Sequence, residues 1–349
     1  MMRYPGMLLA LIWDNKLFVA LTIGFTLLFT VWLFPFNDLS DAVTSAVAKG
    51  TNNQIYIQAG QLNIHLLPKP AISANDLKLE TALPPIEAKW AKVTPGLFSI
   101  LFSLPTVIKA ANGNPEAGRE LSSKISLSIN AEGIFGGEAS LDVGSGKKGE
   151  SGVARSRVSM ALDEINLKDV QRWADLSVNL QGRANFATDM QFSPDFQEQP
   201  EGDYELRVAK FVMPAGTVQV PMQGAVFPVN LPTLTLANVT LKGRMAPGKF
   251  IIEEGMFGQS QDPIYGRIKG QFDVRIQQQM GSIQPSFGEY SLTVDLATSA
   301  EIQRDKTLAI AFAPIEGAKT ATSGGGAKYT FKASGLLGAY PNITRIDSF

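Results

Sequence analysis

Few residues in this chain are of the types that carry out acid–base or metal chemistry. The 349 residues contain one histidine, His65, and no cysteine. A metal site or a Ser-His-Asp triad needs several such side chains held close together. His65 lies in the alternating stretch 61–66, which is typical of a strand, and no G-x-S-x-G motif marks a nucleophilic serine. Hydrolysis through His65 stays an open alternative, but we predict no catalytic residue, no metal site and no cofactor.

Two further patterns also fall short of a catalytic or nucleotide site. The acidic pairs Asp163–Glu164 and Glu253–Glu254 occur in strand-like stretches, where adjacent side chains point to opposite faces. Neither pair therefore presents two carboxylates to one substrate. The stretch 144–148 partly matches the end of a phosphate-binding loop. Such a loop begins with glycine five residues before Gly146, where this chain has Leu141, and it ends in serine or threonine, where this chain has Lys148. We therefore predict that the protein is not an enzyme.

The charge balance argues against a nucleic-acid partner. Lysine and arginine number 31 against 32 acidic residues, which gives a net charge of −1. The basic residues are scattered along the chain, so no stripe exists to neutralise successive phosphates. We therefore expect no nucleic acid among the partners.

One apolar segment near the N-terminus predicts a membrane helix. Residues Leu17–Phe34 contain no charge, and as a helix they extend about 27 Å, close to the thickness of a bilayer core. Arg3 and Lys16 precede the segment, whereas Asp38 and Asp41 follow it. The positive-inside rule then places the N-terminus in the cytoplasm. We expect a single-pass protein whose remaining residues lie on the other side of the membrane.

A cleaved signal peptide is the alternative reading of this segment. Residues 46–48 have the A-x-A form of a cleavage site. They lie more than ten residues beyond the apolar segment, which is itself longer than the apolar region of a usual signal peptide. A retained anchor is the interpretation that we adopt.

Beyond the anchor, the apolar residues mostly alternate with polar ones, which predicts strands. Alternating runs occur at 54–58, 61–66, 124–129, 157–162, 233–236, 290–296 and 329–332. We expect the first two runs, separated by Gly60, to form a hairpin. Glycines also interrupt the runs at 176–186, 236–245 and 266–276, as if two strands met at a bend. The fold class is mainly β: a single N-terminal transmembrane helix, then an elongated, curved antiparallel sheet with a few short helices.

Helices and domain borders are less marked than strands. Short helices are expected after Asp38, within the apolar stretch 97–108 and at 167–174, whereas 144–152, 193–202 and 318–326 have loop composition. We divide the chain into a cytoplasmic tip and anchor (1–36), a juxtamembrane helix with an N-terminal β unit (37–110) and a main β domain (111–349).

The layout of the chain resembles a known family of secretion proteins. The order of anchor, Pro35, short helix, the strand region Ile55–Glu80 and the later segment Leu231–Gly258 is similar to GspN, the type II secretion system protein N. The first third also resembles AsmA-like proteins, with the proline corner Leu67–Pro70. The GspN resemblance implies a bacterial inner-membrane protein with a periplasmic β domain, no enzyme activity, and other type II secretion components as partners.

The AsmA-like resemblance implies a different role, in which a curved sheet forms an apolar groove that holds phospholipid. The two hypotheses predict different inner faces. A lipid groove needs a continuous apolar surface, whereas a scaffold needs a filled core and an exposed edge or patch for protein contacts. Runs such as 225–229 and 249–252 carry apolar residues on both faces, which permits either. From the sequence we favour non-enzymatic secretion, with lipid binding or transfer as the alternative.

Overall fold

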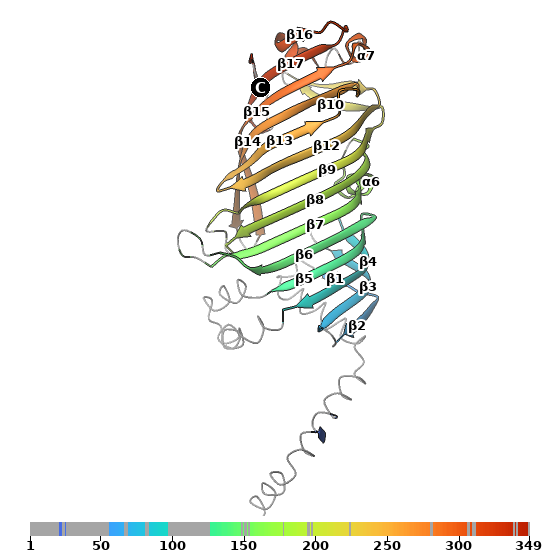
Figure 1. Ribbon diagram of the computed structural model, residues 1–349, viewed down its shortest axis with the longest axis vertical. Helices are drawn as coiled ribbons and strands as arrows, with labels where there is room; N and C mark the ends of the chain where they lie inside the picture. The colour runs from blue at the N-terminus through green and yellow to red at the C-terminus, as the bar shows by residue number, and fades with distance from the viewer. Residues whose placement is uncertain are drawn as a thin grey trace, which may run out of the picture.

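A single long antiparallel sheet dominates the structure (Figure 1). The structure is a computed structural model, and it describes residues 21–22, 25, 56–65, 69–80, 84–96, 126–147, 149, 152, 154–176, 178–193, 196, 198–222, 225–279, 282–305, 308, 312–337, 339 and 341–347. The large sheet contains sixteen strands, and β10 and β11 form a separate two-stranded sheet. The mainly β fold that the alternating sequence predicts is therefore confirmed.

The strands are β1 (Tyr56–Gln58), β2 (Gln61–His65), β3 (Ala71–Glu80), β4 (Ile86–Pro95), β5 (Leu127–Ile134), β6 (Gly137–Ser145), β7 (Ser156–Asn166), β8 (Gln181–Phe192), β9 (Glu201–Met213), β10 (Gly216–Met222), β11 (Ala225–Leu231), β12 (Leu234–Ala246), β13 (Lys249–Phe257), β14 (Ile264–Gln279), β15 (Ser282–Thr298), β16 (Lys319–Ala321), β17 (Ala327–Leu336) and β18 (Asn342–Arg345). The helical elements are α6 (Leu167–Trp173), α7 (Ala300–Arg304) and the 3-10 helix η2 (Ala313–Ala318). Helix α6 confirms the prediction at 167–174.

From β3 to β9, each strand pairs with the next in the chain, and the meander continues through β12, β13, β14, β15 and β17. Strands β4 and β5 pair directly, so the two β units that we expected on either side of residue 110 share one sheet. Most neighbouring strands, such as β5 to β6 and β12 to β13, are joined by short turns, as antiparallel strands can be.

Each end of the sheet is completed by two short strands rather than one long strand. At the N-terminal end, β1 and β2 both pair with β3, one after the other, and Gly60 N–H donates to Asn75 O over 3.0 Å between them. The hairpin that we expected from β1 and β2 is therefore wrong, because both strands lie on the same edge of β3. At the other end, β16 and β18 pair with β17 in the same way. Short, broken edge strands offer little template for an added strand.

Two of the three glycine-interrupted runs lie within single strands with bulges rather than in two strands meeting at a bend, and the third, 176–186, enters β8 only at Gln181. Residues 236–245 lie within β12 and residues 266–276 within β14. The ladder between β12 and β13 shifts register at Gly243, and such bulges increase the local bend of a sheet. On β7 a bulge at Glu164, whose φ is 55°, lets Leu162 and Ile165 both contact the same hydrophobic cluster.

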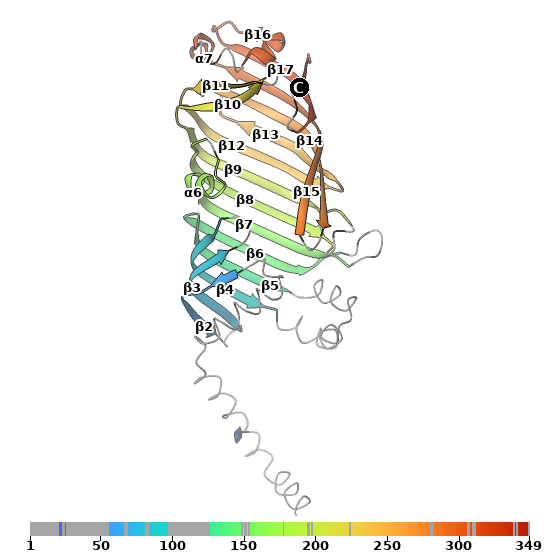
Figure 2. The ribbon, with the colours of Figure 1, turned by 180° about the vertical axis from the view of Figure 1, so that it is seen from behind.

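The sheet is curved, and three elements lie on its concave side (Figure 2). Helix α6 and the β10–β11 hairpin follow one long edge. Along the opposite edge, the far ends of β14 and β15 bend away from the sheet and run beside the turns of the other strands. We call this bent part, residues 274–279 and 282–287, the side wall. Together these elements give the sheet the shape of a trough.

The predicted anchor Leu17–Phe34 lies outside the described residues except for Leu21, Thr22 and Phe25, which are helical. None of the helices that the described residues form has the length and apolar character needed to span a bilayer. The short helices expected after Asp38 and within 97–108 also fall outside the described part of the chain.

Candidate functional site

An unbroken row of apolar positions runs along the concave face. Directly paired residues of an antiparallel sheet share a face, so the register traces this row from strand to strand. The central row comprises Ala74, Ala91, Ala131, Ala139, Leu162, Phe186, Leu206, Leu241, Gly255, Ile268, Val294 and Phe331. These positions lie on neighbouring strands of the large sheet, one on each strand in the order β3 to β9, β12 to β15 and β17. At about 4.8 Å between strands, the row extends about 53 Å.

Two further rows run parallel to the central row on the same face, and both lie on the same side of it. The first comprises Leu127, Val143, Val158, Met190, Gly202, Met245, Phe250, Phe272, Tyr290 and Gly335; the second comprises Ile129, Leu141, Met160, Thr188, Tyr204, Gly243, Ile252, Gly270, Leu292, Ala333 and Ile343. Neither row contains a charged residue. The one hydroxyl on a short side chain, that of Thr188, donates to Asp203 O over 2.8 Å. The concave face is therefore apolar across most of the sheet.

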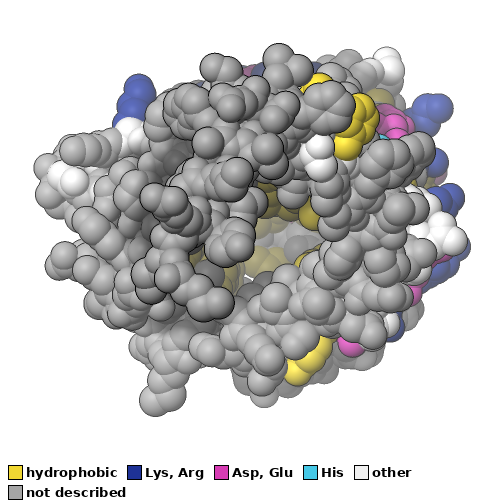
Figure 3. All heavy atoms as spheres, turned by 90° about the horizontal axis from the view of Figure 1, so that it is seen from below, with side chains coloured by type: hydrophobic (Ala, Val, Ile, Leu, Met, Phe, Trp, Pro, Cys, Tyr) yellow, Lys and Arg dark blue, Asp and Glu magenta, His cyan; other side chains and the backbone are white. Residues whose placement is uncertain are grey.

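Among the described residues, the middle of this apolar face remains partly exposed. Along the middle of the central row, Leu162, Phe186, Leu206, Leu241 and Ile268 are all partly exposed. Seen from the end where β2 and β3 lie, the molecule is hollowed, and hydrophobic side chains line the hollow (Figure 3). A sandwich or barrel of this size buries such residues in a continuous core. This sheet instead leaves a long apolar groove.

Aromatic rings and glycines shape the surface where the side wall leaves the sheet. Tyr204 stacks on Phe250 with ring centroids 4.3 Å apart, and Phe272 and Tyr290 continue the series at 6.4 and 6.0 Å. A Cβ on Gly243 would collide with the Tyr204 ring and with Ile251 O, so only glycine lets the ring cross β12. The Tyr204 hydroxyl donates to Ile251 O over 2.9 Å. Burial, and secondarily Glu253, raises the pKa of Tyr204 well above its usual value.

The convex face of the same strands is polar. Beside the central row, its register positions include Asn130, Ser140, Ala161, Ala187, Glu205, Lys242 and Glu254. Ion pairs cross this face, among them Arg157–Asp189, Lys242–Glu205 and Arg244–Glu253. Most of these side chains are exposed, so each pair contributes about 0–1 kcal/mol to stability. The convex face is a solvated surface.

The side wall is fastened to the edge of the sheet at two points. Val274 N–H donates to Gly248 O in the β12–β13 turn over 3.0 Å. Farther along, the Gln199 amide pairs with the backbone of Ile276: Nε2 donates to Ile276 O over 3.0 Å, and Oε1 accepts from Ile276 N–H over 2.8 Å. The loop that follows β8 thus holds β14 as an adjacent strand would.

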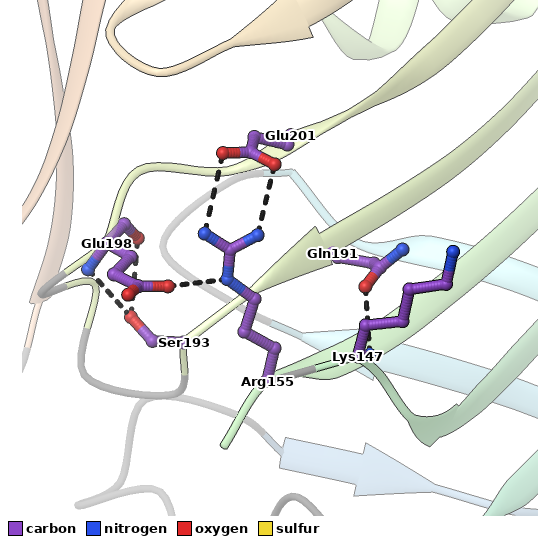
Figure 4. A network of polar contacts seen from close by, with 6 residues as sticks. All are labelled: Lys147, Arg155, Gln191, Ser193, Glu198 and Glu201. Carbon is purple, nitrogen blue, oxygen red and sulfur yellow. Dashed lines mark hydrogen bonds and ion pairs between the residues drawn. The ribbon is translucent and has the colours of Figure 1, made fainter. Parts of the chain in front are cut away.

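A buried arginine fixes that loop in turn (Figure 4). Arg155, 9% exposed, donates through Nε to Glu198 over 2.5 Å and through both terminal nitrogens to Glu201 over 3.0 and 3.4 Å. These hydrogen bonds, led by the one to Glu201, raise the pKa of Arg155 above its usual value. The Ser193 hydroxyl, fully buried, accepts from Glu198 N–H over 3.0 Å. We call Arg155, Ser193, Glu198, Gln199 and Glu201 the clasp.

A cavity of about 770 Å³ lies at the same edge of the sheet, beside β4 to β7. Leu127 and Val143, which belong to the concave face, line it together with Asp142 and Arg157 from the convex face. Apolar and charged side chains therefore meet around one opening at the edge of the groove.

The residues singled out for chemistry do not come together. His65 Nε2 lies 2.9 Å from Ser73 Oγ, but Ser73 is only 4% exposed, so a substrate has no access to its hydroxyl. Glu164 lies in the bulge of β7, and Glu253 pairs with Arg244 on the convex side. The backbone N–H of Lys147 donates to Gln191 Oε1 over 3.0 Å (Figure 4). Within the described residues, no group of histidine, aspartate and glutamate side chains is placed to hold a metal ion.

Sequence reasoning found the strands but not the clasp or the side wall. Arg155 and Glu198 lie 43 residues apart, and Gln199 and Ile276 lie 77 residues apart, so no local spacing joins them.

Comparison of the chain with family models, with curated proteins and with solved structures finds no match in any of the three.

Proposed function

We propose that this protein binds the acyl chains of phospholipid in the concave groove. The observation that carries the proposal is the central row: its positions on twelve successive strands are all apolar or glycine, and its middle side chains are partly exposed. A scaffold would be expected to fill such a face with its own core. This feature favours the lipid-binding alternative over the secretion role that we favoured from the sequence alone.

The size of the groove suits an acyl chain. The hydrocarbon core of a bilayer is about 30 Å thick for two layers of chains, so one chain extends about 15 Å. The partly exposed part of the row, from Ala139 to Val294, extends about 34 Å at about 4.8 Å between strands, which is long enough for such a chain to lie along it. Each methylene moved from water to an apolar surface contributes about 0.8 kcal/mol, so ten contribute about 8 kcal/mol before the costs of binding.

Two further features support phospholipid as the ligand. The edge cavity combines Leu127 and Val143 with Arg157 and Lys69, which matches a molecule with an apolar tail and a charged headgroup. The predicted membrane segment Leu17–Phe34 precedes β1 in the chain, and β1 lies near the hollowed end of the sheet. On this proposal the protein is anchored in the bacterial inner membrane, and the groove lies in the periplasm, close to a supply of lipid.

A role in type II secretion, through contacts with other secretion components, remains a second candidate. Three exposed apolar side chains favour it: Phe287, Leu336 and Leu337 are 58%, 57% and 53% exposed. They lie close together, since Leu337 N–H donates to Gly288 O over 3.5 Å. Exposed apolar side chains that gather on one edge are typical of protein contacts. The broken edge strands at both ends of the sheet argue against partners that bind by strand addition.

Lipid and protein analysis of one purified sample separates the two candidates. The intact chain is purified in mild detergent, and its phospholipid and its co-purifying proteins are both identified by mass spectrometry. We expect phospholipid in stoichiometric amounts, reduced in Leu241→Asp but retained in Thr240→Asp, the adjacent convex position. Secretion components without lipid would instead support the second candidate. Equal lipid in both variants would rule out the groove as the binding site.

A further inference from the structure

The apolar face ends in a filled core at its C-terminal end. The segment between β15 and β17 contains α7 and η2, and it packs on the concave side of these strands. There Ala327 and Tyr329 are each 1% exposed, Ala318 is 4% exposed and Phe331 is 8% exposed. Phe312 stacks on Tyr329 with ring centroids 5.4 Å apart. The last rung of the central row is therefore occupied by the protein itself.

Polar contacts fix this closure in place. Gln303, at the end of α7, donates through Nε2 to Tyr329 Oη over 3.0 Å and to Thr298 Oγ1 over 2.9 Å. The Thr298 hydroxyl donates to Ala327 O over 3.2 Å. Every buried side-chain nitrogen or oxygen of the described residues has a hydrogen-bond partner. A close-packed and fully hydrogen-bonded cluster is typical of a permanent core rather than of a movable lid.

We infer that the groove is closed at β17, so that acyl chains bind along the part of the central row between Ala139 and Val294, where the side chains are partly exposed, and do not pass beyond β17. The inference rests on the proposed function, because it concerns the same groove. It distinguishes a carrier of limited capacity from a channel through which lipid travels along the whole sheet. Phospholipid then enters and leaves on the hollowed side of the molecule, toward the N-terminal end of the sheet or along the trough.

Position-specific photo-cross-linking tests the inference on the intact chain. Benzoylphenylalanine replaces Leu162, Leu241 or Arg345 in separate variants, and each variant is incubated with phosphatidylethanolamine–phosphatidylglycerol vesicles whose acyl chains are radiolabelled. Leu162 and Leu241 are partly exposed positions of the central row. Arg345 pairs with Phe331 and is exposed, so it lies just beyond the closure and tolerates replacement. Ala161, adjacent to Leu162 on the convex side, provides the background.

We expect lipid adducts at positions 162 and 241, and only the background level of position 161 at position 345. Adducts at positions 162, 241 and 345 alike would show that chains pass the closure, and would overturn the inference while leaving the proposed function intact. Background labelling at every position would remove the proposed function and the inference together.

Discussion

Leu241 and Lys242 are neighbours on β12, yet they belong to opposite surfaces. Leu241 pairs with Leu206 and Gly255 on the concave face, whereas Lys242 pairs with Glu205 and Glu254 on the convex face. The same division holds along the meander, where apolar rungs face inward and hydroxyls, amides and ion pairs face outward. Strand periodicity alone produces this division. What distinguishes this protein from a sandwich is that, among the described residues, the middle of the inner face stays partly exposed.

The concave face itself also contains two kinds of surface. At its C-terminal end, Tyr329 is 1% exposed within a core that includes Phe312 and Ala318. In the middle, Leu162 packs against the cluster around Ile165 but remains partly exposed. Apolar residues of the central row are therefore buried at both ends, as at Ala91 and Phe331, and keep part of their surface accessible to a ligand in the middle.

The largest predicted effect contrasts these two parts of the face. Tyr329→Ala removes a stacked ring from a filled core, and we expect a loss of about 3–5 kcal/mol in the free energy of unfolding. Leu162→Ala removes a partly exposed side chain, and we expect a loss of about 1 kcal/mol. Urea unfolding of the two variants measures the difference. Equal losses would show that the middle of the groove is packed as a core.

A second comparison concerns two arginines near the start of β7. Arg155 is 9% exposed between two carboxylates, whereas Arg157 pairs with Asp189 in the open. Arg155→Met leaves carboxylates close together without their cation, and we expect a loss of about 3 kcal/mol, because Glu201 is partly exposed. Arg157→Met should cost less than about 1 kcal/mol. Thermal unfolding distinguishes the two, and a similar loss in both variants would contradict the structural role of the clasp.

A smaller effect is expected for the fastening of the side wall. Gln199→Ala removes both hydrogen bonds to Ile276, and we expect the wall to loosen at a cost of about 1–3 kcal/mol. The readout is amide hydrogen exchange, which should accelerate at Ile276. Gln191→Ala is the control, because Gln191 Oε1 accepts its hydrogen bond from Lys147 N–H rather than from the side wall. Unchanged exchange at Ile276 in Gln199→Ala would show that the wall is held by other contacts.

The smallest effect appears at alkaline pH. Burial raises the pKa of Tyr204, so its hydroxyl stays protonated in the folded protein when an unfolded tyrosine, with a pKa of about 10, ionises. The stability that depends on the neutral phenol is therefore complete below pH 10 and declines as the pH rises, by at most about 1.4 kcal/mol per pH unit. Tyr204→Phe should flatten this decline relative to Tyr265→Phe, which removes an exposed phenol. Parallel declines in the two variants would contradict the burial of Tyr204.

The alternating runs predicted the sheet because side-chain periodicity is a local property. Residues 157–162, 290–296 and 329–332 all lie in strands, and 167–173 form the expected short helix with Asn166 as its N-cap. The expected hairpin at residues 54–66 failed because β1 and β2 find their partner in β3, and strand pairing depends on the whole sheet. The glycine-interrupted runs failed for a related reason, since glycine permits both a bulge and a turn.

The groove was not predictable from the residues alone. Alternation showed that one face of the sheet is apolar, but whether that face is covered depends on where the connections fold. The β15–β17 connection covers Tyr329 and Phe331, whereas the side wall leaves the middle of the face accessible. The clasp joins Arg155 to Glu198 and Glu201 through tertiary contacts, and no sequence spacing indicates them.

The most direct test of the central claim uses the absence of cysteine from the chain. Single-cysteine variants Leu241→Cys and Thr240→Cys place an environment-sensitive fluorophore on the concave and the convex side of the same strand. The account predicts that phospholipid vesicles shift the emission to shorter wavelength at position 241 and leave it unchanged at position 240. Equal shifts at both positions, or none at position 241, would contradict lipid binding in the groove.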